Sequence, residues 1–276
     1  NRGRSIMVDV SSFHLQWGFM LWGYALLLPF LAWVGWSRRF NWVSLVWMLG
    51  LVLLMWALCR PRASVQMPVF DQSLMLILDV SGSMKANDVK PSRIEAAAEL
   101  VRSFIDLQPS QVKLGIVLVS SAASVVQIPT QDREALHRAI EQLPLQPGSA
   151  LGTGVLVALK QLAPDVKLDS AAILRGEMPQ ASSLKPSESA EHGAMVLISD
   201  GQGNMGPKLS EMARLSQILG FKIFTIGVGT PEGAILKAEG IQARVKLDEA
   251  PLQQVAEATG GEYFRVVSAA DIRRLY

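Results

Sequence analysis

The stretch Leu74-Met75-Leu76-Ile77-Leu78-Asp79-Val80-Ser81-Gly82-Ser83-Met84 decides the fold. Its five leading apolar residues predict a strand that is buried on both faces, as strands of a parallel sheet are. The run then breaks into Asp79, Ser81 and Ser83, with Gly82 allowing a sharp turn. In open α/β sheets, ligands bind outside the carboxyl ends of the strands, and this turn falls at such an end.

One carboxylate and two hydroxyls alternate on this turn, so their oxygens can face the same way. Oxygen ligands of this kind suit a hard divalent cation, with Mg²⁺ favoured and Mn²⁺ and Ca²⁺ as alternatives. A simpler interpretation is an Asp-Ser turn after a core strand, held by hydrogen bonds from side chain to backbone. The turn by itself leaves both interpretations open.

Composition separates an apolar, basic beginning from a slightly acidic remainder. Residues 1–62 hold six of the 26 Lys/Arg and one of the 24 Asp/Glu, so their net charge is +5. The net charge of residues 63–276 is −3. The pI near 8.7 therefore comes from the first segment, and no basic stripe interleaved with aromatic residues indicates nucleic-acid binding. The single cysteine, Cys59, excludes an internal disulfide, and three scattered histidines argue against a zinc cluster.

Two long apolar spans, 15–36 and 42–59, follow a tail of residues 1–14. At ~1.5 Å per residue each span reaches roughly 27–33 Å, which is enough to cross a ~30 Å hydrocarbon core. Tryptophans gather towards the ends of the spans, as in an interfacial aromatic belt. The polar faces of a soluble helical hairpin and the small-residue cleavage site of a signal peptide are both missing. We therefore predict a transmembrane helical hairpin over 15–62, set in the lipid bilayer, with a linker over 63–72.

From residue 73 to 276, apolar runs typical of buried strands alternate with patterns of 3.6-residue period. Residues 124–129 are predicted to form an antiparallel edge strand, and the polar, serine-rich segment 165–193 a flexible surface insertion. The alternation predicts the α/β class, with a doubly wound, mostly parallel sheet. The predicted strands are 74–79, 112–120, 124–129, 194–199, 222–228 and 262–266, and the predicted helices 92–107, 131–143, 151–162, 207–219, 248–259 and 268–276.

Two further loops belong to the same predicted edge of the sheet. The strand 194–199 also ends in a carboxylate, Asp200, and the glycine-flanked loop 148–154 carries Ser149 just before a helix. Ser149 equally fits an ordinary helix N-cap. Because the carboxyl ends of parallel strands meet at one edge, the oxygen-bearing side chains of these loops can converge on one cation. The predicted metal ligands are Asp79, Ser81, Ser83, Ser149 and Asp200.

The three loops resemble those of a known family. Asp79-Val80-Ser81-Gly82-Ser83 resembles the Asp-x-Ser-x-Ser signature of the metal-ion-dependent adhesion site (MIDAS) of von Willebrand factor A (VWA) domains. Ser-Asp-Gly at 199–201 is similar to the second Asp loop of that family. The loop 148–152 resembles the one that supplies the family's Thr, but Ser149 takes that position and Thr153 falls four residues later. The resemblance covers residues 70–276 and implies a Rossmann-like VWA fold with a magnesium site.

The two apolar spans, the junction Ala57-Leu58-Cys59-Arg60-Pro61-Arg62 and the VWA-like remainder resemble the membrane-anchored Bat (aerotolerance) subfamily. This resemblance implies a multi-pass protein of the bacterial inner membrane that works with a MoxR-type AAA+ ATPase and with other membrane VWA proteins. It also implies a further transmembrane helix after Tyr276. The loop arginines and the resemblance favour a periplasmic domain over a cytoplasmic one.

These observations favour a binding module whose cation accepts a Glu or Asp side chain of a protein partner, and we do not expect an enzyme. A Mg²⁺-dependent hydrolase or phosphatase with Asp79 as nucleophile is the alternative, but such enzymes need a second carboxylate two residues on, where Ser81 stands. A channel or transporter subunit is a third hypothesis. The apolar spans lack the internal ionisable residues that mark an ion path.

Overall fold

The computed structural model describes residues 13–15, 46, 49–50, 61–63, 72–141, 143–238 and 241–266. The chain divides into two compact units, residues 1–69 and 70–276. In the first unit, strand β1 (Phe13–Leu15) pairs antiparallel with strand β2 (Pro61–Ala63). Among the described residues, no helix has the length and apolar character needed to cross a membrane. The predicted spans 15–36 and 42–59 lie almost entirely outside the described residues.

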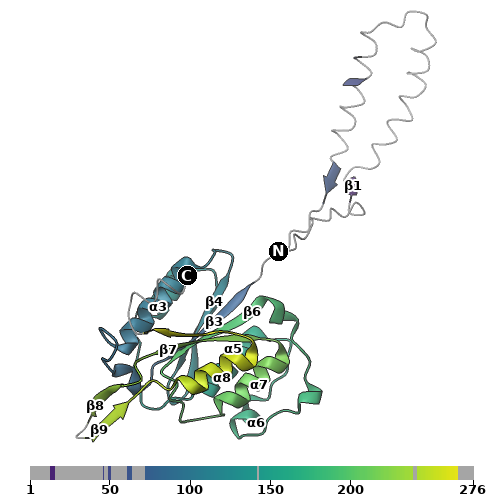
Figure 1. Ribbon diagram of the computed structural model, residues 1–276. Coiled ribbons are helices and arrows are strands. Elements are labelled where there is room, and N and C mark those ends of the chain that lie inside the picture. The colour runs from purple at the N-terminus through teal and green to yellow at the C-terminus, as the bar shows by residue number, and fades with distance from the viewer. Residues whose placement is uncertain are drawn as a thin grey trace, which may run out of the picture. The chain divides into compact units, whose positions relative to one another are not determined.

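The second unit is built on a six-stranded sheet, ordered β10-β7-β6-β3-β4-β5. All neighbouring strands are parallel except the β4–β5 pair, which is antiparallel. The predicted α/β sheet, mostly parallel with one antiparallel edge strand, is thus confirmed (Figure 1). The strands are β3 (Ser73–Asp79), β4 (Lys113–Val119), β5 (Ala123–Thr130), β6 (Gly193–Ser199), β7 (Lys222–Val228) and β10 (Tyr263–Val266).

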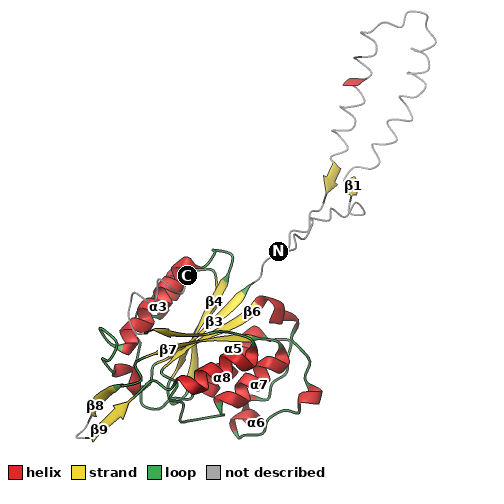
Figure 2. Ribbon diagram, viewed as in Figure 1, coloured by secondary structure: helices red, strands yellow, loops and turns green. Residues whose placement is uncertain are grey.

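Helices cover both faces of this sheet, as a doubly wound fold requires (Figure 2). One face packs against α5 (Leu151–Leu162), α7 (Leu209–Leu219) and α8 (Glu249–Thr259). The other face packs against α3 (Arg93–Leu107) and α4 (Arg133–Ala139). The helix ends follow local chemistry: the Ser92 hydroxyl accepts from the Glu95 amide at the start of α3, and Gly260 closes α8 in the left-handed conformation.

The central strand β3 supplies the core of both layers. Met75 and Ile77 point to the α5 face, whereas Leu76 and Leu78 point to the α3 face, and all four are fully buried. A strand that must bury both sets of alternating side chains has no polar positions, which is why residues 74–78 are continuously apolar. The apolar run predicted as a two-sided buried strand therefore lies at the centre of the sheet.

In the second unit, the structure adds a hairpin that the sequence patterns did not predict. Strands β8 (Ala234–Ala238) and β9 (Ile241–Val245) form an antiparallel hairpin between β7 and α8. Its second strand alternates apolar and polar residues, whereas its first strand begins with three apolar residues in a row, so the alternating pattern covers only five residues.

Two predicted segments differ in detail, and a third is not described. The segment 165–193, predicted to be irregular, contains the short helix α6 (Ser170–Leu174) and the 3-10 helices η4 (Ala181–Ser183) and η5 (Glu188–His192). The helix predicted at 131–143 is shorter, because α4 begins after the Asp132 cap and ends at Ala139. The predicted final helix, 268–276, lies outside the described residues.

The edge strand β5 is irregular. Its register against β4 shifts twice, on either side of Ile116, which indicates a bulge in the ladder. Val126 and Ile128 are exposed on this strand, and Pro129 near its end has no amide hydrogen to donate.

Gly152 lies in the first turn of α5, where a side chain has no room. A Cβ at this position would overlap the backbone carbonyl of Pro207. We predict that Gly152→Ala lowers the free energy of unfolding by about 1–3 kcal/mol, because backbone must move to admit the methyl group. Urea unfolding of the purified chain measures this change. The control Lys160→Ala, at an exposed position of the same helix, should stay within ~0.5 kcal/mol, and an equal effect of both variants would contradict the prediction.

Candidate metal centre

The site begins where two neighbouring parallel strands end. Strands β3 and β6 run in register, with Leu78 opposite Ile198, so the next positions, Asp79 and Ser199, come side by side. The Ser199 hydroxyl donates to Asp79 Oδ2 at 2.6 Å. Asp200 follows immediately, and both carboxyl groups are fully buried. The strand register thus places two carboxylates at one edge of the sheet, as the sequence predicts.

Asp79 is surrounded by hydrogen-bond donors from its own loop and from a distant one. Its Oδ1 accepts from the Ser81 amide at 2.9 Å, and its Oδ2 accepts from the Ser149 hydroxyl at 3.2 Å. The Ser81 and Ser83 hydroxyls are hydrogen-bonded to each other at 3.0 Å. This contact becomes feasible because the chain enters the short 3-10 helix η3 (Gly82–Lys85) directly after Ser81.

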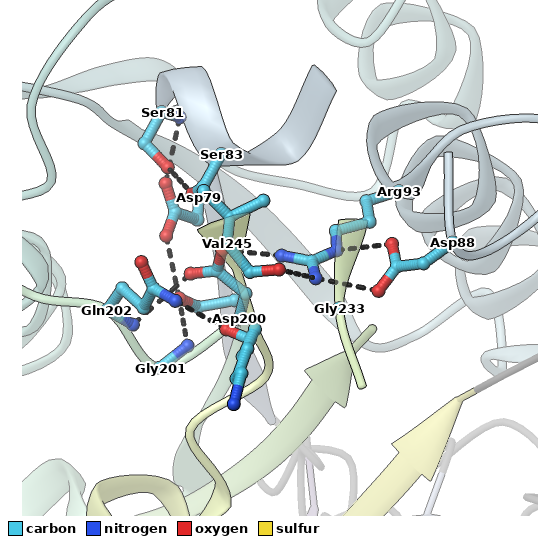
Figure 3. Close-up of polar contacts among 12 residues, drawn as sticks. Asp79, Ser81, Ser83, Asp88, Arg93, Asp200, Gly201, Gln202, Gly233 and Val245 are labelled. Atoms are coloured by element: carbon cyan, nitrogen blue, oxygen red, sulfur yellow. Dashed lines mark hydrogen bonds and ion pairs between the residues drawn. The ribbon is translucent and has the colours of Figure 1, made fainter. Parts of the chain in front are cut away.

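Asp200 is held by a cation and by its own loop (Figure 3). Arg93 Nη1 donates to its Oδ2 at 2.8 Å, and the Gln202 amide donates to its Oδ1 at 3.2 Å. The Ser83 hydroxyl lies near this carboxyl group and acts to lower its pKa. Gly201 makes the turn with φ +80°, and a Cβ there would overlap the backbone carbonyl of Asp248.

Ser149 reaches the site because the loop after Asp200 fixes its backbone. The Ser149 amide donates to Asn204 Oδ1 at 2.9 Å, and the Ser149 carbonyl accepts from the amides of Asn204 and Met205 at 2.9 and 3.1 Å. The N-cap alternative for Ser149 is wrong: α5 starts at Leu151 with Ala150 as cap, so the serine hydroxyl is free to bond Asp79. Ser149 therefore occupies the position that the VWA resemblance assigns to a hydroxyl.

The structure brings all five predicted residues into one oxygen cluster, linked by the contacts just described. Asp79, Ser81, Ser149 and Asp200 are buried, whereas Ser83 is half-buried and lies towards the solvent. The residues that sequence reasoning missed are supporting ones: Ser199 and Asn204, which hold Asp79 and Ser149, and Arg93, which appears in the sequence only as a helix start. Their partners are 55 to 120 positions away along the chain, so no local pattern identifies them.

Burial decides the electrostatics of the cluster. It raises the pKa of Asp79, and the nearby charge of Asp200 raises it further against the hydrogen bonds from Ser199 and Ser81. Burial also raises the pKa of Asp200, although the contacts of Ser83, Gln202 and Arg93 oppose this effect. Two carboxylates that disfavour each other's ionisation form a place where a positive charge is stabilised.

The donor set fits a hard divalent cation. Within the part of the chain that the structure describes, no three His, Cys, Asp or Glu side chains come together as a metal site. A site here must therefore mix two carboxylates with three hydroxyls, which is an all-oxygen set of the kind Mg²⁺ accepts. Asp79 has no ion-pair partner among the described residues, and a buried carboxylate without one is costly. A cation between the two Asp loops would offset that cost.

Comparison with known proteins agrees with this fold. Residues 74–202 match the family model of the von Willebrand factor type A domain. The chain thus contains a VWA domain, and the oxygen cluster lies on its Asp79, Ser149 and Asp200 loops.

Similar proteins then define the family. A UPF0353 protein of Nocardia farcinica is 31% identical over 243 residues, which cover 83% of this chain and 68% of the relative. A UPF0353 protein of Mycobacterium sp. (strain KMS) is 34% identical over 233 residues, which cover 82% and 65%. The chain belongs to the UPF0353 family of VWA-domain proteins and spans about two thirds of the length of these relatives.

Solved structures share the fold. An aerotolerance-related membrane protein from Bacteroides fragilis is 24% identical, with a TM-score of 0.58, over 74% of this chain and 96% of that one. The conserved hypothetical protein BatB from Bacteroides thetaiotaomicron is also 24% identical, with a TM-score of 0.58, over 74% and 95%. The predicted similarity to Bat-type membrane VWA proteins is confirmed by these structural neighbours.

The raised pKa of Asp79 makes the stability of the cation-free protein depend on pH. In the unfolded chain this carboxyl keeps its ordinary pKa near 3.8, so stability falls as pH rises from there through the raised pKa of the folded state. We predict that the unfolding temperature of the chain in EDTA falls as the pH rises towards neutral. The Asp79→Asn variant should show a smaller fall. At neutral pH, Mg²⁺ should raise the unfolding temperature of the unaltered chain but not that of Asp79→Asn. Thermal unfolding with and without Mg²⁺ measures all three effects.

The matched control is Asp169→Asn. Asp169 is an exposed N-cap of α6, and Asn caps a helix equally well. This control should behave like the unaltered chain, whereas a Mg²⁺ stabilisation that survives in Asp79→Asn would contradict the assignment of Asp79.

Proposed function

We propose that this protein is a divalent-cation-dependent interaction module that binds an acidic group of a protein partner. The observation that carries the proposal is the buried pair of carboxylates, Asp79 and Asp200, with the hydroxyls of Ser81, Ser83 and Ser149 gathered beside them at the edge of the sheet. VWA domains of Bat-type membrane proteins support an interaction role for this fold. Domains of this class commonly bind a divalent metal through a MIDAS, which makes a cation the natural occupant.

In this proposal, five side chains hold the cation. The hydroxyls of Ser81, Ser83 and Ser149 bind it, and Asp79 and Asp200 bind it directly or through water. The bound ion would act as a Lewis acid that attracts a carboxylate. Three of its ligands are neutral and Arg93 already neutralises part of the Asp200 charge, so the ion keeps much of its positive charge. A Glu or Asp of the partner then completes its coordination.

The cation proposed is Mg²⁺, with Mn²⁺ and Ca²⁺ as alternatives. Short serine hydroxyls and two carboxylates form a compact donor set, and Mg²⁺ prefers few protein ligands with the remaining positions filled by water or by a bound molecule. Ca²⁺ needs six to eight oxygens, more than the five side chains provide with one oxygen each.

The same geometry supports binding over hydrolysis. A nucleophilic Asp79 would need a second carboxyl group two positions on, to act as acid and base. The residue two positions on is Ser81, whose hydroxyl bonds to Ser83 and cannot serve as a carboxyl acid or base. We therefore propose a non-enzymatic role.

We further propose that the chain is anchored in the bacterial inner membrane by the segment 15–62 and that a MoxR-type AAA+ ATPase and other membrane VWA proteins are its partners. The apolar character of 15–36 and 42–59 supports the anchor. The structural neighbours in Bacteroides, one described as an aerotolerance-related membrane protein and one as BatB, support the membrane setting. The partner class follows from the resemblance of the sequence to the Bat subfamily. The periplasmic side proposed for the domain rests on the Bat resemblance, because two arginines stand in the loop and four stand on the side of the domain.

The cation and its open position can be tested together. We predict that Mn²⁺ binds the purified chain, and that pulsed electron paramagnetic resonance detects coupling of this Mn²⁺ to the carboxyl carbon of added ¹³C-acetate. Ser83→Ala should weaken Mn²⁺ binding about tenfold, since one hydroxyl ligand is lost, while leaving the fold intact. Ser124→Ala, an exposed serine on the edge strand, is the control.

Two results would count against the proposal. If Mn²⁺ binds but acetate produces no carbon coupling, the ion has no open position for an acidic partner. If p-nitrophenyl phosphate is hydrolysed in a Mg²⁺- and Asp79-dependent manner, the hydrolase is the correct interpretation.

The membrane proposal has its own test. We predict that the chain resists extraction by alkaline carbonate and that external protease digests residues 72–266 in spheroplasts while cytoplasmic markers survive. Digestion only after lysis would place the domain in the cytoplasm. Complete release by carbonate would exclude a transmembrane anchor.

A further inference from the structure

Arg93 occupies an unusual position for a charged side chain. It stands at the start of α3 and is fully buried, yet it is not one of the proposed metal ligands. Its guanidinium holds Asp88 through two hydrogen bonds of 2.7 Å, Nε to Oδ1 and Nη2 to Oδ2, and holds Asp200 through Nη1 at 2.8 Å. Figure 3 shows the guanidinium between these two carboxylates. One cation thus bridges a metal-site loop and the segment before α3.

Asp88 extends the bridge to the β8–β9 hairpin. Its Oδ2 accepts from both the amide and the hydroxyl of Thr230, at 2.9 and 3.0 Å. The Thr230 carbonyl in turn accepts from the amides of Gly233 and Leu247, each at 3.1 Å. Those two residues stand just before β8 and just after β9, so Thr230 ties the two arms of the hairpin together at its base.

A second set of contacts joins the hairpin base to the loop after β6. The Asp248 amide donates to the Asp200 carbonyl at 2.8 Å, and the Gln202 side chain donates to the Lys246 carbonyl. Arg93 Nη2 also reaches the Val245 carbonyl at 3.4 Å. The hairpin base and the Asp200 loop are therefore connected both through backbone and through the cluster of Asp88, Arg93 and Asp200.

A buried ion cluster of this kind is a poor device for stability alone. The desolvation of its charges offsets most of their attraction, and apolar residues of similar size often stabilise a fold as well or better. The cluster instead fixes the relative positions of its members, because each guanidinium nitrogen donates to a particular oxygen. If Asp200 shifts, Arg93 must shift with it or a charged hydrogen bond must break.

We propose that Arg93 is a positioning residue of the metal site, which couples Asp200 through Asp88 and Thr230 to the base of the β8–β9 hairpin, so that cation binding orders the hairpin. The inference rests on the proposed cation site. In this proposal, binding of the cation at the Asp79 and Asp200 loops changes the order of the hairpin and so changes the exposed surface that the hairpin presents. Ile235 and Arg244 are cross-strand neighbours there and are both exposed.

Hydrogen–deuterium exchange of the full chain, with and without saturating Mg²⁺, tests the coupling. In the unaltered protein, Mg²⁺ should slow exchange in two places: the loop 79–84, which binds the ion, and the amides of Gly233 and Leu247 at the hairpin base. Coupling between two sites typically changes a binding equilibrium ~5–150-fold. We therefore expect Mg²⁺ to slow amide exchange at the hairpin base at least about fivefold. Asp88→Asn removes one charge of the cluster and should abolish the hairpin effect while the effect at 79–84 remains.

A matched pair at position 230 separates coupling from simple loss of structure. Thr230→Val removes the hydroxyl that bonds to Asp88 but keeps the shape, whereas Thr230→Ser keeps the hydroxyl. Because the same hydroxyl accepts from the Gly233 amide, the Leu247 amide is the reporter for this pair. The valine variant should lose most of the Mg²⁺ effect at the hairpin, and the serine variant should retain it. By reciprocity, the valine variant should also change the Mg²⁺ affinity, measured by calorimetry, by the same factor as the lost coupling.

Each outcome decides between the two proposals. Mg²⁺ protection at 79–84 with no change at the hairpin overturns the coupling and leaves the cation site standing. Equal hairpin protection in the Thr230→Val and Thr230→Ser variants also overturns the coupling. No heat of Mg²⁺ binding and no protection at 79–84 overturns the cation site itself, and the coupling with it.

Discussion

The structure of the site depends on two carboxyl groups that are buried side by side. The parallel register of β3 and β6 brings Asp79 next to Ser199 and so next to Asp200, and neither group reaches solvent. Ionised carboxylates in such a place need compensation. Asp200 receives it from a guanidinium, whereas Asp79 receives only the neutral donors of Ser81, Ser149 and Ser199. This asymmetry explains why the three loops are joined so closely and why a cation fits between them.

Much of this arrangement could be predicted from the sequence, because it follows from patterns that are short and periodic. The apolar run before Asp79 indicates a strand buried on both faces, and β3 occupies the centre of the sheet. The alternation of strands and helices predicts which ends of the strands share an edge. Once that edge is known, Asp79, Ser149 and Asp200 can be expected to meet, and they do.

Other features could not be predicted, and the reason is physical. Arg93 is selected as a partner by a carboxylate 107 positions away, and a sequence pattern contains no information on such a distance. The β8–β9 hairpin gives only a short signal, because the five residues of β9 alternate apolar and polar side chains whereas β8 begins with three apolar residues in a row. The role of Ser149 was left open because an N-cap and a metal ligand require the same small hydroxyl side chain. Only the fold shows that Ala150 takes the cap position.

The irregular edge strand β5 limits how this domain can associate. An open strand edge normally offers a row of amides and carbonyls to which a foreign strand can add. Here a bulge against β4 interrupts the row, and Pro129 removes one donor from it. Self-templated sheet extension, the first step of many β-aggregates, is thereby discouraged on that side. Many copies held close together would therefore carry less risk of fibrous assembly through this strand than its exposed Val126 and Ile128 suggest.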